Sequence, residues 1–206
     1  PLLAGRASDP RELDRLSWDD WMTDATRHFD ELARDHPRIV VGGLSAGGTM
    51  ALSLSLHRPV ASLLLYAAAL SLQYRVTALA PYLWRVVPRW PRATAALGAP
   101  GRYERVPVRA VGELVTGMRR VRARLGEIHA PALVVHSIDD PLVPVASARR
   151  LARELGGPVE LLILPGRSHA FTAEVEERDR LGEVSVAQLW RHVPLGAAPN
   201  VVPADR

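Results

Sequence analysis

Residues 39–49 of this chain read Ile-Val-Val-Gly-Gly-Leu-Ser-Ala-Gly-Gly-Thr. The apolar run at the start predicts a short buried strand, and the glycines after it predict a sharp turn. Small and apolar residues from 46 to 57 predict a buried helix, which Pro59 ends. A strand, a tight turn and a helix in this order, with the pattern G-x-S-x-G centred on Ser45, are typical of a turn that exposes a nucleophilic serine.

The glycines of this turn have a predicted steric task. Side chains at Gly43 and Gly47 are expected to collide as the strand and the helix approach each other. Ser45 would then present its hydroxyl at the carboxyl edge of the sheet, and the N–H of Ala46 would point at an oxyanion formed there. The alternative is a glycine-rich turn that binds phosphate. A dinucleotide site would need G-x-G-x-x-G and an acidic residue about 20 positions later, and this stretch has neither.

The rest of the chain alternates between strands and helices. Apolar runs without polar alternation predict strands at 61–66, 131–136 and 159–164. Helical patterns are expected at 18–34, 108–126, 145–155 and 173–193. Strands of this kind are typical of a mostly parallel sheet covered by helices on both faces, so the sequence predicts an α/β fold.

The length of 206 residues predicts a single domain. Its core is expected to comprise 1–70 and 108–193, followed by a tail at 194–206. Prolines interrupt residues 71–107, which we interpret as a small cap of short helices inserted into the core and not part of the sheet.

Aromatic residues of this insertion are candidates for substrate contact. Tyr74, Trp84 and Trp90 could line a substrate pocket, since an apolar cap suits uncharged substrates better than charged ones. The alternative for each of them is packing of the cap onto the sheet, which is the commoner role of large aromatic side chains.

The composition excludes several function classes. The chain has no cysteine, which excludes disulfides, thiolate metal sites and a cysteine nucleophile. Its basic residues are all arginines scattered among acidic residues, with a net charge of +4, so nucleic-acid binding is not expected. No apolar run approaches the ~18 residues of a membrane span and no signal peptide is visible, so we expect a cytoplasmic protein without stable membrane insertion. Histidine spacing suggests no metal site, and no cofactor is expected.

A serine hydroxyl needs a base to take its proton, and the base needs a third group to orient it. On such a scaffold the acid and then the histidine follow later strands. Asp139 and Asp140 both follow the strand at 131–136, and their position alone does not choose between them. His169 lies in the loop after the strand at 159–164, where the base is required. The remaining histidines are interpreted as structural or surface residues: His28, His36, His57, His129, His136 and His192.

These motifs resemble those of the α/β-hydrolase superfamily, especially its small bacterial carboxylesterases and monoacylglycerol lipases. Residues 18–21 are similar to the family's D-D-W segment, and residues 41–49 to its V-x-G-L-S-M/L-G-G turn. Residues 136–144 are similar to H-G-x-x-D-x-x-V-P, whose acid falls on Asp140. Residues 168–174 are similar to the segment that carries the family's catalytic histidine.

The resemblance implies an α/β-hydrolase fold and a serine esterase that works through an acyl-enzyme. Ser45 would be the nucleophile, His169 the base, Asp140 its orienting partner and the N–H of Ala46 an oxyanion donor. The implied substrate is a small ester with a short or medium acyl chain, or a monoacylglycerol, and the oligomeric state stays open. The alternatives are a thioesterase, peptidase or acyltransferase with the same triad, and a non-catalytic binding protein with this fold.

The chain departs from the family at its N-terminus. Relatives usually begin with further strands and an H-G-F/L-x-G loop that supplies a second oxyanion donor. Neither is present, and residues 1–6 are similar to the loop that follows those strands. We therefore expect an N-terminally truncated domain or a fragment of a longer chain. Missing edge strands are expected to expose sheet and apolar surface.

Overall fold

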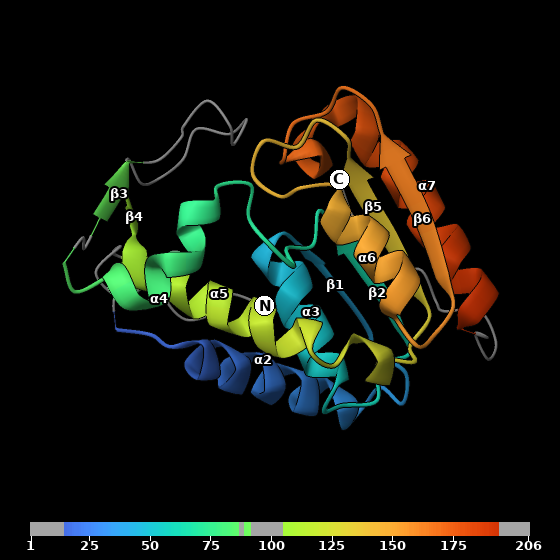
Figure 1. Cartoon of the computed structure of the whole chain (residues 1–206). Helices are drawn as coiled ribbons and strands as arrows, with labels where there is room; N and C mark the ends of the chain where they lie inside the picture. Colours follow the sequence, from blue (N-terminus) through green and yellow to red (C-terminus); the bar gives the residue numbers. More distant parts are fainter. Residues whose placement is uncertain (1–14, 87–88, 92–104, 194–206) are drawn as a thin grey trace, which may run out of the picture.

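The computed structural model describes residues 15–86, 89–91 and 105–193 (Figure 1). Its main sheet is four-stranded and parallel, in the order β1-β2-β5-β6. The strands are β1 Val40–Leu44, β2 Ser62–Tyr66, β5 Ala132–Ser137 and β6 Val159–Leu164. The predicted parallel α/β architecture is confirmed. Strand β1 extends further than expected, through both glycines to Leu44, so the turn itself begins at Ser45.

Helices connect and cover these strands. They are α2 Trp18–Ala33, α3 Ala46–Ser55, α4 Ala80–Leu83, α5 Val108–Arg122, α6 Ala146–Glu154 and α7 Val175–His192. Short 3-10 turns lie at η1 Arg75–Leu79, η3 Leu125–Glu127 and η4 Phe171–Ala173. Ser17 starts α2 through a capping box, in which its hydroxyl accepts from the N–H of Asp20 at 3.2 Å and the Asp20 carboxylate accepts from the Ser17 N–H at 2.8 Å.

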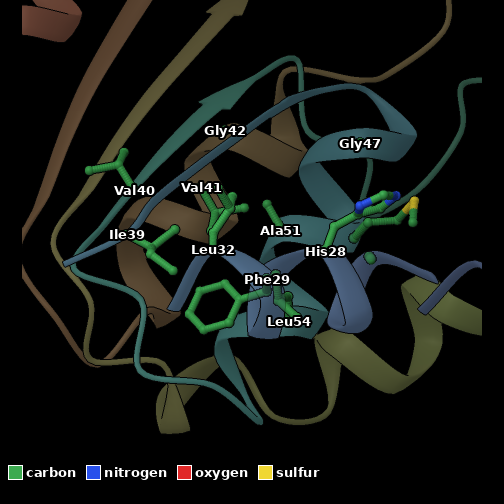
Figure 2. Close-up of a pocket in the computed structure, with 12 residues that line it drawn as sticks. His28, Phe29, Leu32, Ile39, Val40, Val41, Gly42, Gly47, Ala51 and Leu54 are labelled. Carbon is green, nitrogen blue, oxygen red and sulfur yellow. The ribbon is translucent and has the colours of Figure 1, made fainter. Parts of the chain in front are cut away.

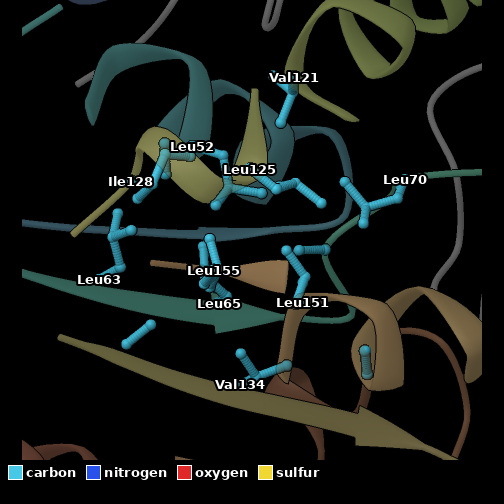
Figure 3. Packing of buried hydrophobic residues seen from close by; sticks show 14 residues of the cluster. Leu52, Leu63, Leu65, Leu70, Val121, Leu125, Ile128, Val134, Leu151 and Leu155 are labelled. Atoms are coloured by element: carbon cyan, nitrogen blue, oxygen red, sulfur yellow. The ribbon is translucent and has the colours of Figure 1, made fainter. Parts of the chain in front are cut away.

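Neighbouring residues of the central strands are buried on opposite faces of the sheet. On one face Leu65 and Val134 pack with residues of α3, α5 and α6 (Figure 3). On the other face Leu133 and Val135 pack with Leu181 of α7. Because both faces are covered here, the central strands β2 and β5 are apolar runs instead of alternating ones, and β5 is buried along its whole length.

The insertion between β2 and α5 differs in part from the expectation. Short helices occur as predicted, at η1 and α4, and α4 packs on α5. The described part also contains a two-stranded antiparallel ladder, β3 Arg89–Pro91 with β4 Arg105–Pro107, which the sequence did not predict. Each of these strands is three residues long and ends in proline. Because proline usually marks a break in secondary structure, its presence concealed these strands in the sequence. Proline is nevertheless tolerated at the end of a strand where its missing N–H is not needed for pairing.

Strand β1 forms one edge of the main sheet and, among the described strands, pairs only with β2. A hollow of about 280 Å³ lies along it, between the strand and helices α2 and α3 (Figure 2). Apolar side chains dominate its walls, among them Phe29, Leu32, Val41 and Leu54. Within the described residues, apolar surface is therefore accessible beside the sheet edge, and Ser45, Asp140 and His169 are not part of this hollow.

The strand and the helix of the serine turn meet at glycines, although not at both of those expected. A Cβ on Gly43 would lie 2.3 Å from the carbonyl carbon of Gly47, and one on Gly48 would lie 2.6 Å from the Cβ of Ala68. A Cβ on Gly47 would meet no described atom within 4 Å. The expected collision at Gly47 is thus wrong for the described residues, because an added Cβ there would enter open space, and Gly48 is the second crowded position.

Replacing Gly43 with alanine is expected to destabilise the protein by about 1–3 kcal/mol or more, since the obstructing atoms belong to the backbone and cannot turn aside. For a chain of this size, a loss of about 1–3 kcal/mol lowers the Tm by roughly 2–12 °C. Gly47→Ala, two residues into α3, is the matched control and should keep or slightly raise the Tm. Thermal unfolding followed by circular dichroism measures both; equal Tm values for Gly43→Ala and the parent would contradict the steric account.

Candidate active site

Ser45 occupies a strained backbone position between β1 and α3. Its φ of 56° and ψ of −118° are rare for a residue with a side chain and cost about 1–3 kcal/mol. Hydrogen bonds hold the turn in this state: the Ser45 N–H donates to the carbonyl of Tyr66 at 2.9 Å, and the Ser45 carbonyl accepts from the N–H of Ala69 and of Thr49, both at 3.2 Å. The turn is thereby tied to the chain that leaves β2, at the carboxyl edge of the sheet.

Ala46 is the first residue of α3. The first N–H groups of a helix have no carbonyl of a preceding turn to bind, and they lie at the positive end of the helix dipole. The N–H of Ala46 is therefore a donor of the type that an anion beside Ser45 requires.

Asp140 and His169 form a buried pair. The two residues are 3% and 5% exposed, and the Nδ1–H of the His169 ring donates to Oδ2 of Asp140 at 2.7 Å. The other carboxylate oxygen accepts from the N–H groups of Leu142 at 2.8 Å and Val143 at 3.0 Å. With the proton on Nδ1, the Nε2 of His169 is the basic nitrogen of the ring.

The electrostatics keep Asp140 ionised. Burial raises the pKa of this carboxyl, but the hydrogen bonds from His169 and from the N–H groups of Val143 and Leu142 outweigh it, so its pKa lies below the ordinary range. An ionised Asp140 favours the ring tautomer that leaves Nε2 free, and it also stabilises the ring when it gains a proton.

Asp139, the other candidate acid, occupies a different place. It is exposed and accepts from the N–H of Gly166 at 2.8 Å. The Ser137 hydroxyl donates to the carbonyl of Arg167 at 2.7 Å, so the loop after β5 is joined to the loop that carries His169. Farther along that loop, Glu174 accepts from the Ser168 hydroxyl at 2.7 Å. These bonds position the loop, whereas Asp140 alone of the two aspartates contacts the imidazole.

His136 lies beside the buried pair of Asp140 and His169, although the sequence had suggested only a structural or surface role for it. It is fully buried, its Nε2 lies 3.0 Å from the Val143 carbonyl and 3.7 Å from Oδ2 of Asp140, and its Nδ1 has no partner within the described residues. Burial lowers its pKa, so the ring is neutral near neutral pH. Its position at the start of the H-G-x-x-D pattern was the signal that could have placed it beside the acid.

The predicted substrate-contact residues Tyr74, Trp84 and Trp90 belong to the insertion between β2 and α5. Tyr74 is 53% exposed. The ring of Trp84 has the guanidinium carbons of Arg85 and Arg109 at 5.1 and 5.2 Å from its centroid, a cation–π arrangement. The side chain of Trp90, residues 1–6 and the tail at 194–206 lie outside what the structure describes.

The structure thus brings Asp140 and His169 into contact and places Ser45 at the end of a strand in the same parallel sheet. In the part of the chain described here, the Ser45 hydroxyl makes no hydrogen bond to His169. Nor do the described residues include a cluster of three or more His, Asp or Glu side chains suited to a metal ion.

The lowered pKa values of His136 and Asp140 predict that the folded state loses stability in two steps as pH falls. His136 has a pKa lowered in the folded state, so the unfolded chain binds this proton more readily, and stability is lost as pH falls from about 6.5 towards the folded pKa. Asp140 also has a lowered pKa, so its contribution is present above about 3.9 and lost as pH falls through the folded value. Urea unfolding at pH 7, 5 and 3 measures both steps. The loss between pH 7 and 5 should be smaller in His136→Gln, and an unchanged loss would contradict the assignment to His136.

Known proteins are similar to this chain over most of its length. A family model described as serine aminopeptidase, S33, matches residues 5–176. The thermostable monoacylglycerol lipase of Bacillus sp. (strain H-257) is 26% identical over 187 residues, which span 86% of this chain and 73% of the lipase. None of the described helices has both the length and the hydropathy that crossing a membrane requires.

Solved structures of lipolytic enzymes are also similar to this chain. One, from work on the metagenome-derived lipolytic enzymes LipS and LipT, superposes with a TM-score of 0.84 at 25% identity and covers 93% of this chain and 81% of its own. The monoacylglycerol lipase of Paleococcus ferrophilus superposes with a TM-score of 0.69 at 20% identity, covering 83% of this chain and 76% of its own. At 20% identity, the likeness to the Paleococcus ferrophilus lipase shows a shared fold.

Proposed function

Because the chain belongs to the serine aminopeptidase S33 family of α/β-hydrolases and is a lipase-like serine hydrolase, we propose that it hydrolyses carboxylic esters through Ser45, His169 and Asp140. The single observation that supports this most is the buried 2.7 Å hydrogen bond between Asp140 and His169. The strained Ser45 directly follows the first strand of the same sheet.

The proposed reaction has two steps. The Nε2 of His169 takes the Ser45 proton as Oγ attacks the ester carbonyl, and the N–H of Ala46 stabilises the oxyanion. The tetrahedral intermediate collapses, the alcohol leaves with the proton from His169, and an acyl-enzyme remains. Water then attacks the acyl group with His169 again as base, which releases the acid and restores Ser45. Catalytic hydrogen bonds are often long before substrate binds, so formation of the bond between Ser45 and His169 belongs to this proposal.

The proposed substrates are esters of short or medium acyl chain or monoacylglycerols. Similarity to a monoacylglycerol lipase supports this class. So does the apolar surface of the insertion, where Val76, Leu79, Tyr82 and Val86 are each more than half exposed. In this proposal residues 71–107 form the cap of a single domain, and Tyr74, Trp84 and Trp90 stay candidates for contact with the acyl chain.

A substrate panel tests the class. Nitrophenyl esters from acetate to laurate, a monoacylglycerol and an acyl thioester of matched length are compared by kcat/KM with the full chain. We expect the highest values for oxygen esters of short or medium chain or for the monoacylglycerol. A higher kcat/KM for the thioester would replace the esterase by a thioesterase, and no turnover or product burst on any of them would favour a non-catalytic binding protein.

A further inference from the structure

A second hollow, of about 630 Å³, lies between the chain that leaves β2, η1 and the C-terminal half of α5. Its polar walls include Arg75, Arg119 and Arg122, together with Ser71, Gln73 and Thr77. Ser45, Asp140 and His169 are not among its lining residues. Its volume falls within the range of small-molecule sites, roughly 300–1,000 Å³.

The charges of this hollow are unbalanced. Arg119 and Arg122 are three positions apart on α5 and so share a face of that helix. Arg119 donates to the carbonyl of Ala78 at 3.0 Å, a neutral partner. Arg122 is half-buried and, within the described ranges, has neither a hydrogen bond nor an ion pair. No described lining residue carries a carboxylate.

The electrostatic surroundings of Arg122 are unfavourable to its charge. Burial, followed by the like charges of Arg150 and Arg119, lowers the pKa of its guanidinium, which nevertheless stays protonated. Arg150 itself is engaged with Glu154 at 2.8 Å. A partly desolvated cation without a counter-ion is costly, and an anion that entered the hollow would remove that cost.

We propose that this hollow binds a phosphate group, either as free phosphate or as part of a small organic phosphate. Guanidinium groups bind phosphate oxygens through paired N–H donors, and the amide side chain of Gln73 supplies a further donor. A phosphate dianion offsets two arginine charges, whereas a monocarboxylate offsets one, so phosphate fits the walls better than acetate does.

Isothermal titration of the full chain with sodium phosphate, at matched ionic strength in sodium chloride, tests this site. Arg122→Gln is expected to weaken phosphate binding about 10- to 100-fold, the value of one charge-assisted contact. Arg120→Gln is the control, because Arg120 lies on the same helix but outside the hollow and is paired with Asp19. Arg120→Gln should bind phosphate as the parent does, and both variants should keep the ester hydrolysis rate of the parent in phosphate-free buffer.

A second titration, with glycerol 3-phosphate, distinguishes free phosphate from a small organic phosphate as the ligand. Tighter binding than for inorganic phosphate would support an organic phosphate that fills more of the hollow, and equal binding would support a site for the free ion. The proposal is overturned if the parent binds acetate as well as phosphate or binds neither, if Arg122→Gln binds phosphate like the parent, or if Arg120→Gln loses as much as Arg122→Gln.

Discussion

Replacing Ser45 with alanine is expected to lower kcat for ester hydrolysis by about 10⁶-fold, the scale of loss when a serine hydrolase loses its nucleophile. The hydroxyl is the group that the acyl-enzyme requires, and neither His169 nor the helix N-terminus can replace it. The variant should fold, since alanine only removes an oxygen that makes no hydrogen bond to His169 in the described structure. Initial rates on a nitrophenyl ester, with circular dichroism to verify folding, measure the effect.

A glycine at the same position separates chemistry from strain. Ser45→Gly should be as inactive as Ser45→Ala, but more stable than it by about 1–2 kcal/mol, because glycine adopts a φ of 56° without strain. That difference corresponds to roughly 2–8 °C in Tm for a chain of this size. An active alanine variant would remove Ser45 from the mechanism, and a glycine variant less stable than the alanine variant would refute the strain.

Asp140→Asn should lower kcat by about 10⁴-fold, as in other serine hydrolases whose triad acid becomes an amide. The amide can donate to Nδ1 of His169, which then carries its proton on Nε2, the wrong nitrogen for accepting one from Ser45. The amide also removes the negative charge that stabilises the protonated ring. Rates measured with saturating ester, beside thermal unfolding, separate this loss from misfolding.

Asp139→Asn is the matched control for this experiment. It changes the same chemical group at the adjacent position, but Asp139 is exposed and contacts the N–H of Gly166 instead of the imidazole. Its rate should stay within about tenfold of the parent, since only one loop contact is weakened. A larger loss in Asp139→Asn than in Asp140→Asn would assign the acid to Asp139.

Much of the fold could be predicted because local pattern and burial agree. The runs at 61–66 and 131–136 are apolar at nearly consecutive positions, and the structure covers both of their faces, whereas the edge strand at 159–164 contains Glu160 and exposes Leu161. The turn at Ser45 was predictable because strand, glycines and helix are contiguous in the sequence. The ladder of β3 and β4 was hidden because its short strands carry prolines, which also mark breaks.

The site was harder to predict where it depends on contacts between distant segments. Position after a strand did not separate Asp139 from Asp140, and only the resemblance placed the acid on Asp140; in the structure, the buried Asp140 contacts His169 and Asp139 is exposed. The environment of His136 depends on the fold of the loop that returns Val143 to it. At Gly48 the crowding comes from Ala68, which follows β2, so the sequence around the serine turn could not predict it.

The proposed mechanism depends on activation of Ser45 by His169, which Asp140 holds in place. Its most direct measurement is the reaction of the full chain with a fluorophosphonate, followed by mass spectrometry of the peptides. We expect one phosphonyl adduct on Ser45, formed quickly in the parent and in Asp139→Asn, far more slowly in Asp140→Asn and His169→Ala, and absent in Ser45→Ala. An adduct on another residue, or equal rates of labelling with and without His169, would contradict the mechanism.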